Sequence, residues 1–517
     1  DWTPDSTGVY YTWLPVDATS PVAQRPGFAE IRYHAVGTDP AKDPIIHPRT
    51  NDPTTFLSPD LSRDGRWLFA YVRRGWNEND IYVRDLKDRR QKVFRLVVKG
   101  KDALYNLHAW QGQLYIHTNE GASNHRIFKT AATRFERRHW KELVPADQEA
   151  NLEGFSLVGG HLALQYLRNA FTELRVVTLA GRPARTIALP GIGTASGVHG
   201  LEDDDEGYFG YSSYTQPGQV RQVSVKTGHS TLWSKVEVPV DPRPYVVEQV
   251  FYPSKDGTRI SMFIVRRRGI KFDGQNPTLL YGYGGFLVNM TPRFAASIYP
   301  WLEAGGVWAE PNLRGGGEYG KQWHDAGKGA NKQNVFDDHI AAAEWLIANQ
   351  YTRPEKLAIY GGSNGGLLVG AAMIQRPDLY RAVICTVPLL DMVRYHRFGS
   401  GRTWISEYGT AEKAADFAVL HAYSPYHHVR PGTRYPALLV MSSDHDDRVD
   451  PMHARKFTAA IQAASASRLP VLLRIEMNAG HGGADQVRRR IEQSADLYAF
   501  LMKQLGVTAP ASQSAAP

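Results

Sequence analysis

A chain of 517 residues with 42% hydrophobic and 11% aromatic content can bury more than one core, so we expect two or more domains. No apolar run approaches the ~18 residues that span a bilayer, which predicts a soluble globular protein without a membrane partner. The net charge of +8 does not indicate a nucleic-acid partner, because Lys and Arg are scattered among acidic residues and the one basic run, 87–101, is typical of a solvated face.

Cys385 is the only cysteine, which excludes an intrachain disulfide, and its apolar surroundings (382–387) predict a buried thiol. The chain starts at Asp1 without an initiator Met or a signal peptide, so we expect a processed or truncated N-terminus. The compartment is left open between cytoplasm and periplasm. Residues 508–517 are rich in Pro, Ala and Ser and are predicted to form a disordered tail.

The first part of the chain, residues 1–236, has a repeat that is typical of a β-propeller. Turn-like dipeptides recur with glycines at intervals of 47, 48 and 47 residues: Gly65, Gly112, Gly160 and Gly207. These intervals are close to the roughly 40–50 residues of one propeller blade. Each dipeptide precedes a short strand, at 66–71, 113–117, 161–166 and 208–211, and Thr7-Gly8 before 9–12 gives a fifth copy. We therefore expect a partial propeller of about five blades.

The three middle copies each continue into a second strand with a polar start, at 79–86, 124–129 and 172–179. Alternating polar and apolar residues separated by tight turns indicate antiparallel sheets, whose apolar faces pack on their neighbours. A β-sandwich also has short strands, but it does not predict this regular recurrence.

Residues 236–244, VEVPVDPRP, are proline-rich and predict a linker, beyond which we expect an α/β-hydrolase domain over 237–507. Strands and helices alternate there, which implies a mostly parallel sheet covered on both faces. The expected strands are 249–252, 260–266, 278–283, 307–311, 356–360, 437–441 and 470–476. The expected helices are 336–349, 367–374, 452–464 and 486–505.

Within this second part, residues 361–365 read G-G-S-N-G and match the pattern G-x-S-x-G between a predicted strand and a predicted helix. A serine on such a sharp turn has an exposed hydroxyl, because glycines on either side let strand and helix approach closely. The pattern predicts Ser363 as a nucleophile. The alternative is an ordinary turn between a strand and a helix, since Gly/Ser-rich loops produce the pattern by chance.

Candidates for the partners of Ser363 follow two later strands. Asp444, Asp446 and Asp447 come after the strand at 437–441, and His481 lies on a glycine-flanked loop after the strand at 470–476. The order Ser, acid, His is that of this fold. A serine hydroxyl is a weak nucleophile, so it needs a histidine to accept its proton and a carboxylate to orient the imidazole. Taken singly, these residues also fit a surface histidine and a solvated acidic turn.

Two other patterns do not predict a cofactor or metal site. Residues 314–321 contain G-x-G-x-x-G, but the polar, glycine-broken segment that follows is not the apolar helix of a nucleotide-binding fold. His427, His428, His445 and His453 lack the spacing of a defined metal cluster. We therefore expect neither a cofactor nor a metal.

The chain resembles the prolyl oligopeptidase family of serine peptidases, with weak agreement extending back to Trp2. The motifs that carry the resemblance are YGYGGF (281–286), NLRGGGEYG (312–320), NKQNVFDD (331–338), GGSNGGLL (361–368), DHDDRV (444–449) and AGHGG (479–483). The resemblance implies a seven-bladed propeller that caps an α/β-hydrolase domain, with the active site in the cavity between them.

The resemblance also implies individual roles. It makes Ser363 the nucleophile, Asp446 the acid and His481 the base. It assigns the oxyanion hole to the Tyr283 hydroxyl and the backbone N–H of Asn364, two donors that can stabilise a developing negative oxygen.

For substrate recognition, the resemblance implies an aromatic wall that stacks on a proline and an arginine that binds the preceding carbonyl. The matching residues are Trp404, Tyr408, Phe286, Val449 and Arg448. An apolar slot with an indole suits a rigid pyrrolidine ring. Three further positions bear on the shape of the cavity: Leu389 with Pro388 before it, Ser400, and a propeller loop with Arg73 and Trp76. The bulky indole of Trp76 would narrow the cavity.

The sequence thus predicts a serine endopeptidase, a monomer, that cleaves short peptides after proline through an acyl-enzyme, while the propeller excludes folded proteins. Its activity is expected to rise as His481 loses its proton near neutral pH. One alternative is an oligopeptidase that cleaves after basic residues, with Glu407 as the acidic group, or an esterase of the same fold. Another is a propeller binding module with an inactive hydrolase domain, which the complete triad disfavours.

Members of this family begin with a segment that packs on the hydrolase domain, followed by the first blades, and the sequence matches the family only beyond both. We therefore expect an N-terminally truncated copy with exposed blade edges.

Overall fold

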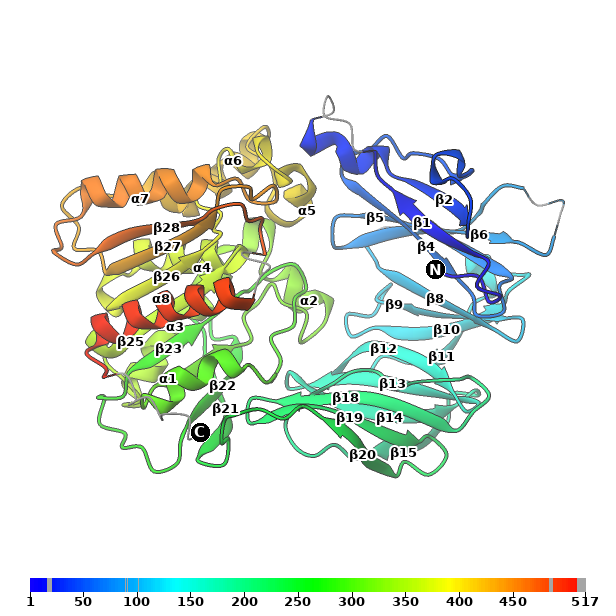
Figure 1. Cartoon of the computed structure of the whole chain (residues 1–517), viewed down its shortest axis with the longest axis horizontal. Helices are drawn as coiled ribbons and strands as arrows, with labels where there is room; N and C mark the ends of the chain where they lie inside the picture. Colours follow the sequence, from blue (N-terminus) through cyan, green and yellow to red (C-terminus); the bar gives the residue numbers. More distant parts are fainter. Residues whose placement is uncertain (16–20, 89, 91, 101, 483–486, 509–517) are drawn as a thin grey trace.

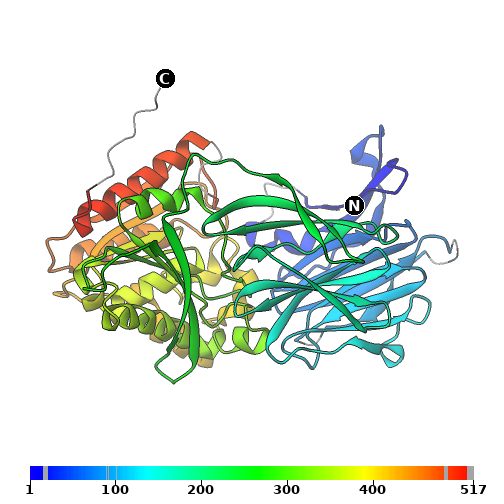
Figure 2. The ribbon, with the colours of Figure 1, turned by 90° about the horizontal axis from the view of Figure 1, so that it is seen from below.

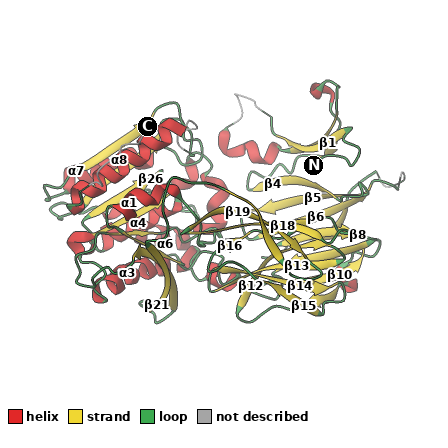
Figure 3. Ribbon diagram, turned by 60° about the horizontal axis from the view of Figure 1, so that its bottom comes forward, coloured by secondary structure: helices red, strands yellow, loops and turns green. Residues whose placement is uncertain are grey.

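The computed structural model describes residues 1–15, 21–88, 90, 92–100, 102–482 and 487–508. Strands build one half of this part of the molecule, and nearly all the helices belong to the other half (Figure 3). The two halves lie side by side (Figures 1 and 2). No helix within these ranges is both long and apolar enough to cross a membrane. Apart from residue 508, the predicted tail lies outside the described residues, as do residues 89, 91 and 101 of the basic run.

The strand-rich half consists of five antiparallel sheets that follow one another along the chain (Figure 1). The first sheet contains β1 (Gly8–Trp13), β2 (Glu30–Ala35) and β3 (Ile45–His47). The next two are β4 (Thr55–Leu61), β5 (Trp67–Arg74), β6 (Glu78–Asp85) and β7 (Arg95–Val98), then β8 (Tyr105–Trp110), β9 (Gln113–Thr118), β10 (Arg126–Ala131) and β11 (Lys141–Val144). The last two are β12 (Ala150–Val158), β13 (His161–Arg168), β14 (Phe171–Thr178) and β15 (Pro183–Ile187), then β16 (Thr194–Ala195), β17 (His199–Gly200), β18 (Glu206–Ser213), β19 (Gln216–Ser224) and β20 (Ser230–Lys235).

Adjacent sheets pack through the apolar positions of the predicted strands. Phe69 and Ile81 of one sheet share a core cluster with Leu107 and Ile116 of the next. Because side chains alternate between the two faces of a strand, the period-two pattern in the sequence places such residues on the faces that meet. The first and last strands of most sheets were not predicted, and some of them, such as β7 and β11, have only four residues.

The glycine turns of the sequence repeat are of two kinds. Gly65, Gly112 and Gly160 have φ of +67°, +70° and +71°, as tight turns before a strand require, which confirms the prediction there. Gly8 and Gly207 instead lie inside β1 and β18, so the predicted turns at these two positions are wrong. A Cβ on Gly207 would lie 2.6 Å from the Val198 side chain, so its glycine serves close packing of neighbouring strands.

The second half contains one eight-stranded sheet in the order β21-β22-β24-β23-β25-β26-β27-β28. From β24 to β28 all neighbouring strands are parallel, while β21 and β22 pair in antiparallel fashion, which confirms the predicted mostly parallel sheet. The strands are β21 (Tyr245–Pro253), β22 (Arg259–Arg267), β23 (Thr278–Tyr281), β24 (Val307–Pro311), β25 (Leu357–Gly362), β26 (Ala382–Thr386), β27 (Ala437–Ser443) and β28 (Val471–Glu476).

Helices cover both faces of this sheet, because successive strand residues point to opposite sides. Helices α3 (Gln333–Ala348), α4 (Asn364–Gln375) and α7 (Met452–Ala464) pack on one face, against residues such as Ile359. Helices α1 (Tyr299–Glu303) and α8 (Val487–Leu505) pack on the other face, against residues such as Ala358. The predicted helix at 452–464 coincides with α7, whereas α2 (Lys321–Asp325), α5 (Ile405–Tyr408) and α6 (Ala414–Tyr423) were not predicted.

Strand β26 was also missed, because its five residues form a short apolar run without alternation. It carries Cys385, which is fully buried and free, as predicted. At the other end of the sheet, β28 is an edge strand whose Leu472 remains 47% exposed. The centre of the sheet is thus buried, whereas its edge at β28 is partly exposed.

Replacing Ile359 by Ala should destabilise the sheet domain by roughly 2–5 kcal/mol, because it opens a cavity at a fully buried position between β23 and β26. Leu472→Ala on the edge strand is the matched control and should cost less than about 1 kcal/mol. Urea unfolding followed by circular dichroism measures both. Equal shifts of the two midpoints would contradict the placement of Ile359 in the core.

Candidate active site

Ser363 lies between the end of β25 and the first residue of α4. Its backbone has φ +57° and ψ −116°, a strained conformation for a residue with a side chain. Its N–H donates to the Thr386 carbonyl of the neighbouring strand at 2.8 Å, which fixes the turn to the sheet. The chain therefore turns sharply from strand to helix and carries the serine at its apex.

The flanking glycines allow this turn. A Cβ on Gly361 would come far closer than 3.0 Å to the carbonyl oxygen of Gly365, and one on Gly365 would lie 2.5 Å from the carbonyl oxygen of Gly282. A Cβ on Gly366 would lie 2.6 Å from the ring of Pro388. Strand, helix and the loop after β23 thus meet with no room for a methyl group, which is the physical reason for the glycine pattern.

A chain of hydrogen bonds joins Ser363, His481 and Asp446. The Nε2 atom of His481 lies 3.2 Å from Ser363 Oγ, and its Nδ1 atom lies 2.8 Å from Asp446 Oδ2. A carboxylate at Nδ1 favours the tautomer with the proton on that nitrogen, which leaves Nε2 to accept the serine proton. The other oxygen of Asp446 accepts from the backbone N–H groups of Arg448 (3.1 Å) and Val449 (2.9 Å).

The geometry also separates the three aspartates that chain order alone left open and of which the resemblance assigns Asp446. Only Asp446 is buried and faces His481. Asp444 pairs with His445 at 2.8 Å and accepts from the Ala479 N–H, which holds the loop of His481 to the end of β27. Asp447 is exposed.

Tyr283 and Asn364 both adjoin the serine: Asn364 is the next residue of the chain, and the Tyr283 hydroxyl is hydrogen-bonded to the Ser363 side chain. Burial raises the pKa of the Tyr283 hydroxyl to about 12, while a hydrogen bond with Ser363 acts in the opposite direction. The hydroxyl therefore remains protonated and can donate at neutral pH. The Asn364 N–H is in the first turn of α4, where the helix itself supplies no acceptor. Its side-chain amide donates to the Tyr283 carbonyl at 2.6 Å.

An aromatic cluster adjoins these groups. Leu389, Trp404, Tyr408 and Val449 are all buried in the same apolar cluster, and Phe286 packs against it. The Phe286 ring stands edge-on to Tyr408 with centroids 5.5 Å apart. The structure thus brings together the four apolar residues that the resemblance assigns to substrate recognition and Leu389, which was expected to shape the cavity.

Tyr395 is a member of this cluster that sequence reasoning missed. Its ring is stacked with Trp404 at 6.3 Å and stands edge-on to Tyr408 at 5.4 Å, so it supports both rings. It lies in RYHR, a charged stretch that gives no apolar pattern.

The charged and polar residues assigned to this region occupy its rim. The exposed Arg448 lies near enough to Tyr283 for its charge to lower the tyrosine's pKa, against the larger effect of burial. Ser400 is outside the aromatic cluster, and its N–H donates to the Arg448 carbonyl at 3.3 Å.

Trp76 of the propeller half packs edge-on against Phe286, with ring centroids 4.9 Å apart. The neighbouring Gly75 touches Ser406, and a side chain there would collide with it. Arg73 lies in strand β5 and not on the loop with Trp76, contrary to the prediction. It lines a cavity of about 230 Å³ between the two halves together with Leu287 and Asn289. The propeller therefore forms part of the wall around the site.

Two family models match the chain. The model of the prolyl oligopeptidase family matches residues 292–508, and that of the prolyl oligopeptidase N-terminal beta-propeller domain matches residues 1–236. A prolyl endopeptidase of Elizabethkingia miricola is 40% identical over 480 residues, which cover 92% of this chain and 68% of that protein. The chain belongs to the prolyl oligopeptidase family. Prolyl oligopeptidase ophP of Omphalotus olearius is 36% identical over 98% of this chain and 70% of its own length.

Solved structures agree with this assignment. A prolyl endopeptidase structure, from work on inter-domain dynamics in two such enzymes, is 61% identical and superimposes with a TM-score of 0.95, covering 98% of this chain and 74% of that one. Prolyl oligopeptidase B of Galerina marginata, bound to a 35-residue hydrolysis and macrocyclisation substrate, is 31% identical with a TM-score of 0.93, over 98% and 72% of the two chains. The predicted fold class, a β-propeller with about five blades here plus an α/β-hydrolase domain, is confirmed, and the protein is a serine peptidase.

Glu407, the acidic group considered for basic substrates, is fully buried with both carboxylate oxygens engaged. One accepts from the Phe286 N–H at 2.9 Å, and the other lies 2.7 Å from His324 Nε2. This arrangement disfavours Glu407 as the partner of a substrate cation.

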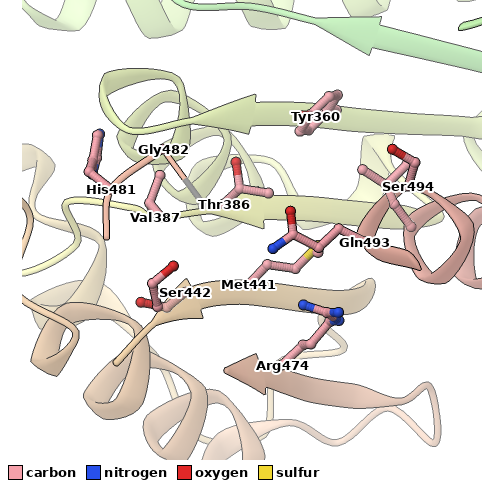
Figure 4. Close-up of a pocket in the computed structure, with 12 residues that line it drawn as sticks. Tyr360, Thr386, Val387, Met441, Ser442, Arg474, His481, Gly482, Gln493 and Ser494 are labelled. Carbon is pink, nitrogen blue, oxygen red and sulfur yellow. The ribbon is translucent and has the colours of Figure 1, made fainter. Parts of the chain in front are cut away.

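A second cavity of about 230 Å³ lies between the sheet and α8 (Figure 4). His481 lies at one end and Arg474 at the other, and Ser363 is not among the lining residues. Within the described ranges, no group of three or more His, Cys, Asp or Glu side chains is arranged to hold a metal ion.

Replacing Gly361 by Ala should lower kcat by about 10²-fold or more, because the added methyl forces β25 away from α4 and displaces Ser363. Gly154→Ala, where the added methyl meets no atom within 4 Å, is the control and should retain full activity. Steady-state kinetics beside circular dichroism would test this. Full activity in Gly361→Ala would show that the close approach is not needed.

Proposed function

We propose that the protein is a serine endopeptidase that cleaves short peptides on the carboxyl side of proline, with Ser363, His481 and Asp446 as its triad. The observation that carries the assignment is the hydrogen-bonded line from Ser363 Oγ through the imidazole to the Asp446 carboxylate. The names of the relatives, prolyl endopeptidase and prolyl oligopeptidase, support the choice of substrate.

In the first half of the reaction, Ser363 Oγ attacks the carbonyl carbon of the substrate while His481 Nε2 accepts the hydroxyl proton. The carbonyl oxygen becomes an oxyanion, which the Tyr283 hydroxyl and the Asn364 N–H stabilise. The C–N bond then breaks, and His481 donates its proton to the departing amine. The product is an ester between Ser363 and the new carboxyl end of the peptide.

In the second half, a water molecule takes the place of the amine. His481 removes one proton from the water as its oxygen attacks the ester carbon, and the same two donors hold the second oxyanion. The ester C–O bond breaks, and the proton returns to Ser363 Oγ. Asp446 keeps the imidazole oriented through both halves, aided by the N–H groups of Arg448 and Val449 that fix the carboxylate.

Preference for proline follows from the aromatic cluster beside Ser363. Trp404, Tyr408 and Phe286 offer flat apolar surfaces to a rigid pyrrolidine ring, which loses little conformational entropy on binding. In this proposal Arg448, exposed at the rim, binds the carbonyl of the residue before proline. Cleavage after basic residues is disfavoured because His324 and the Phe286 N–H already engage Glu407.

We assign the propeller to residues 1–236 and the peptidase domain to residues 237–507. The proposed site then lies between the domains, where Trp76 of the propeller meets Phe286 of the peptidase domain. Such a location restricts access to short, flexible peptides, and the enzyme acts as a monomer because both domains of one chain complete the site.

Replacing Ser363 by Ala should lower kcat for a chromogenic peptide ending in proline by at least about 10⁴-fold, because no other group can form the ester. Ser234→Ala on the exposed surface of β20 is the control and should leave kcat unchanged. The wild type should cleave the proline substrate far faster than matched peptides ending in arginine or an acyl ester. Comparable turnover by Ser363→Ala would overturn the nucleophile, and a preference for arginine would overturn the pocket.

Replacing Tyr283 by Phe should lower kcat by roughly 10²–10³-fold with little change in KM, because the lost hydroxyl acts on the oxyanion of the transition state. Tyr281→Phe, two residues earlier and stacked on Trp308, is the matched control and should stay within about threefold of wild type. An unchanged kcat in Tyr283→Phe would remove this tyrosine from the oxyanion hole.

A further inference from the structure

Three buried ionisable side chains lie beside the proposed oxyanion hole, and the triad uses none of them. Lys332, His324 and Glu407 are each no more than 1% exposed. Burial lowers the pKa of Lys332 to about 8, while the Glu407 charge acts in the opposite direction. Burying a charge is costly unless it is bonded, so the contacts of Lys332 indicate what it is held for.

Lys332 bonds to Asn364 and to the residue next to Tyr283. Its Nζ atom donates to the Gly284 carbonyl at 2.8 Å and to the Asn364 side-chain oxygen at 3.1 Å. Gly284 directly follows Tyr283 in the chain, and Asn364 supplies the second oxyanion donor through its backbone. The Asn364 amide in turn donates to the Tyr283 carbonyl. One ammonium group therefore links Asn364 to the residue that follows Tyr283.

The loop that Lys332 holds needs such support. Gly284 has φ +63°, and the next two non-glycine residues, Phe286 and Leu287, have φ +59° and +58°. For Phe286 and Leu287, which carry side chains, this backbone is strained and persists only where the surroundings impose it. Glu407 holds the Phe286 N–H and Lys332 holds the Gly284 carbonyl, so the loop is fixed at two points.

Simple charge balance does not account for these contacts. His324 and the Phe286 N–H already occupy both oxygens of Glu407, and the hydrogen bonds of Lys332 go to neutral oxygens of the hole residues instead. Tyr408 also donates to the Asn364 side-chain oxygen, at 2.7 Å, so the ammonium and a residue of the proline pocket share one acceptor.

We propose that Lys332 is a positioning residue for the oxyanion hole, which sets the distance between the Tyr283 hydroxyl and the Asn364 N–H. This inference rests on the proposed assignment of those two donors. Because the hole acts on the oxyanion and not on the bound peptide, loss of Lys332 weakens transition-state binding more than substrate binding.

The experiment compares Lys332→Met, which keeps the length but removes the donor, with Lys332→Gln, which retains an N–H donor. Kinetics with a proline chromogenic peptide should show kcat reduced by about 10²-fold in Lys332→Met, with KM within about threefold. Lys332→Gln should recover at least about fivefold of that loss, since an amide N–H can still reach an oxygen acceptor.

Two inhibitors separate the hole from the pocket. A peptide aldehyde ending in prolinal forms a hemiacetal adduct. Ser363 Oγ bonds to the aldehyde carbon and gives its proton to His481 Nε2, the C=O π bond breaks, and the former carbonyl oxygen takes the electron pair and occupies the hole as an oxyanion. The matching peptide alcohol fills the pocket without that oxygen. Lys332→Met should weaken the aldehyde in proportion to the loss in kcat/KM and the alcohol by less than about threefold. Equal weakening of both inhibitors, or of neither, would overturn the proposal.

Controls make each failure distinct. Lys456→Met removes a lysine that pairs with the buried Asp391 elsewhere in the domain and should leave all these constants unchanged. Thermal melting shows whether each variant folds. If Lys332→Met does not fold, the same constants are measured for Lys332→Gln. If Tyr283→Phe leaves aldehyde binding intact, the hole itself is misassigned. If Tyr283→Phe weakens the aldehyde but neither lysine variant does, only the role of Lys332 is wrong.

Discussion

The site depends on how closely three backbone segments approach. Strand β25, helix α4 and the loop after β23 meet where Gly361, Gly365 and Gly282 leave no space for a side chain. This contact places Ser363 on its turn, between the first residue of α4 and the loop that carries Tyr283. Other parts of the domain complete the arrangement. The sheet holds the serine N–H through Thr386, and two later loops bring Asp446 and His481 to the serine.

Around that contact, hydrogen bonds between polar groups hold the backbone rigid, as apolar packing does elsewhere in the domain. Asp446 is fixed by two backbone N–H groups, and the loop after Tyr283 is held by Asn364, Lys332 and Glu407. A satisfied buried network specifies one geometry, because each broken bond leaves an unpaired polar group in a medium of low dielectric constant. In the proposed mechanism, the two donors assigned to the hole are therefore oriented before the substrate arrives, which is what electrostatic stabilisation of a transition state requires.

Much of this arrangement could be read from the sequence because it depends on local patterns. Ser363 and His481 lie in glycine-flanked turns after recognisable strands, and the propeller repeat follows from glycine spacing. Other features depend on contacts between distant segments. The choice of Asp446 over Asp444 and Asp447 is made by the loop that faces His481, and Tyr395 enters the aromatic cluster from a charged stretch. Strand β26 has no periodicity to reveal it, because both of its faces are buried.

The contact between Trp76 and Phe286 links the shape of the pocket to the arrangement of the domains. Phe286 belongs to the peptidase domain but rests on a ring of the propeller, so the pocket wall is complete only while the two domains are together. A ligand that packs on Phe286 in this position therefore stabilises the arrangement in which Trp76 and Phe286 are in contact. By thermodynamic linkage, that contact increases the binding free energy of the ligand by the same amount. Recognition of proline and enclosure of the substrate then depend on the same equilibrium, the one between separated and contacting domains.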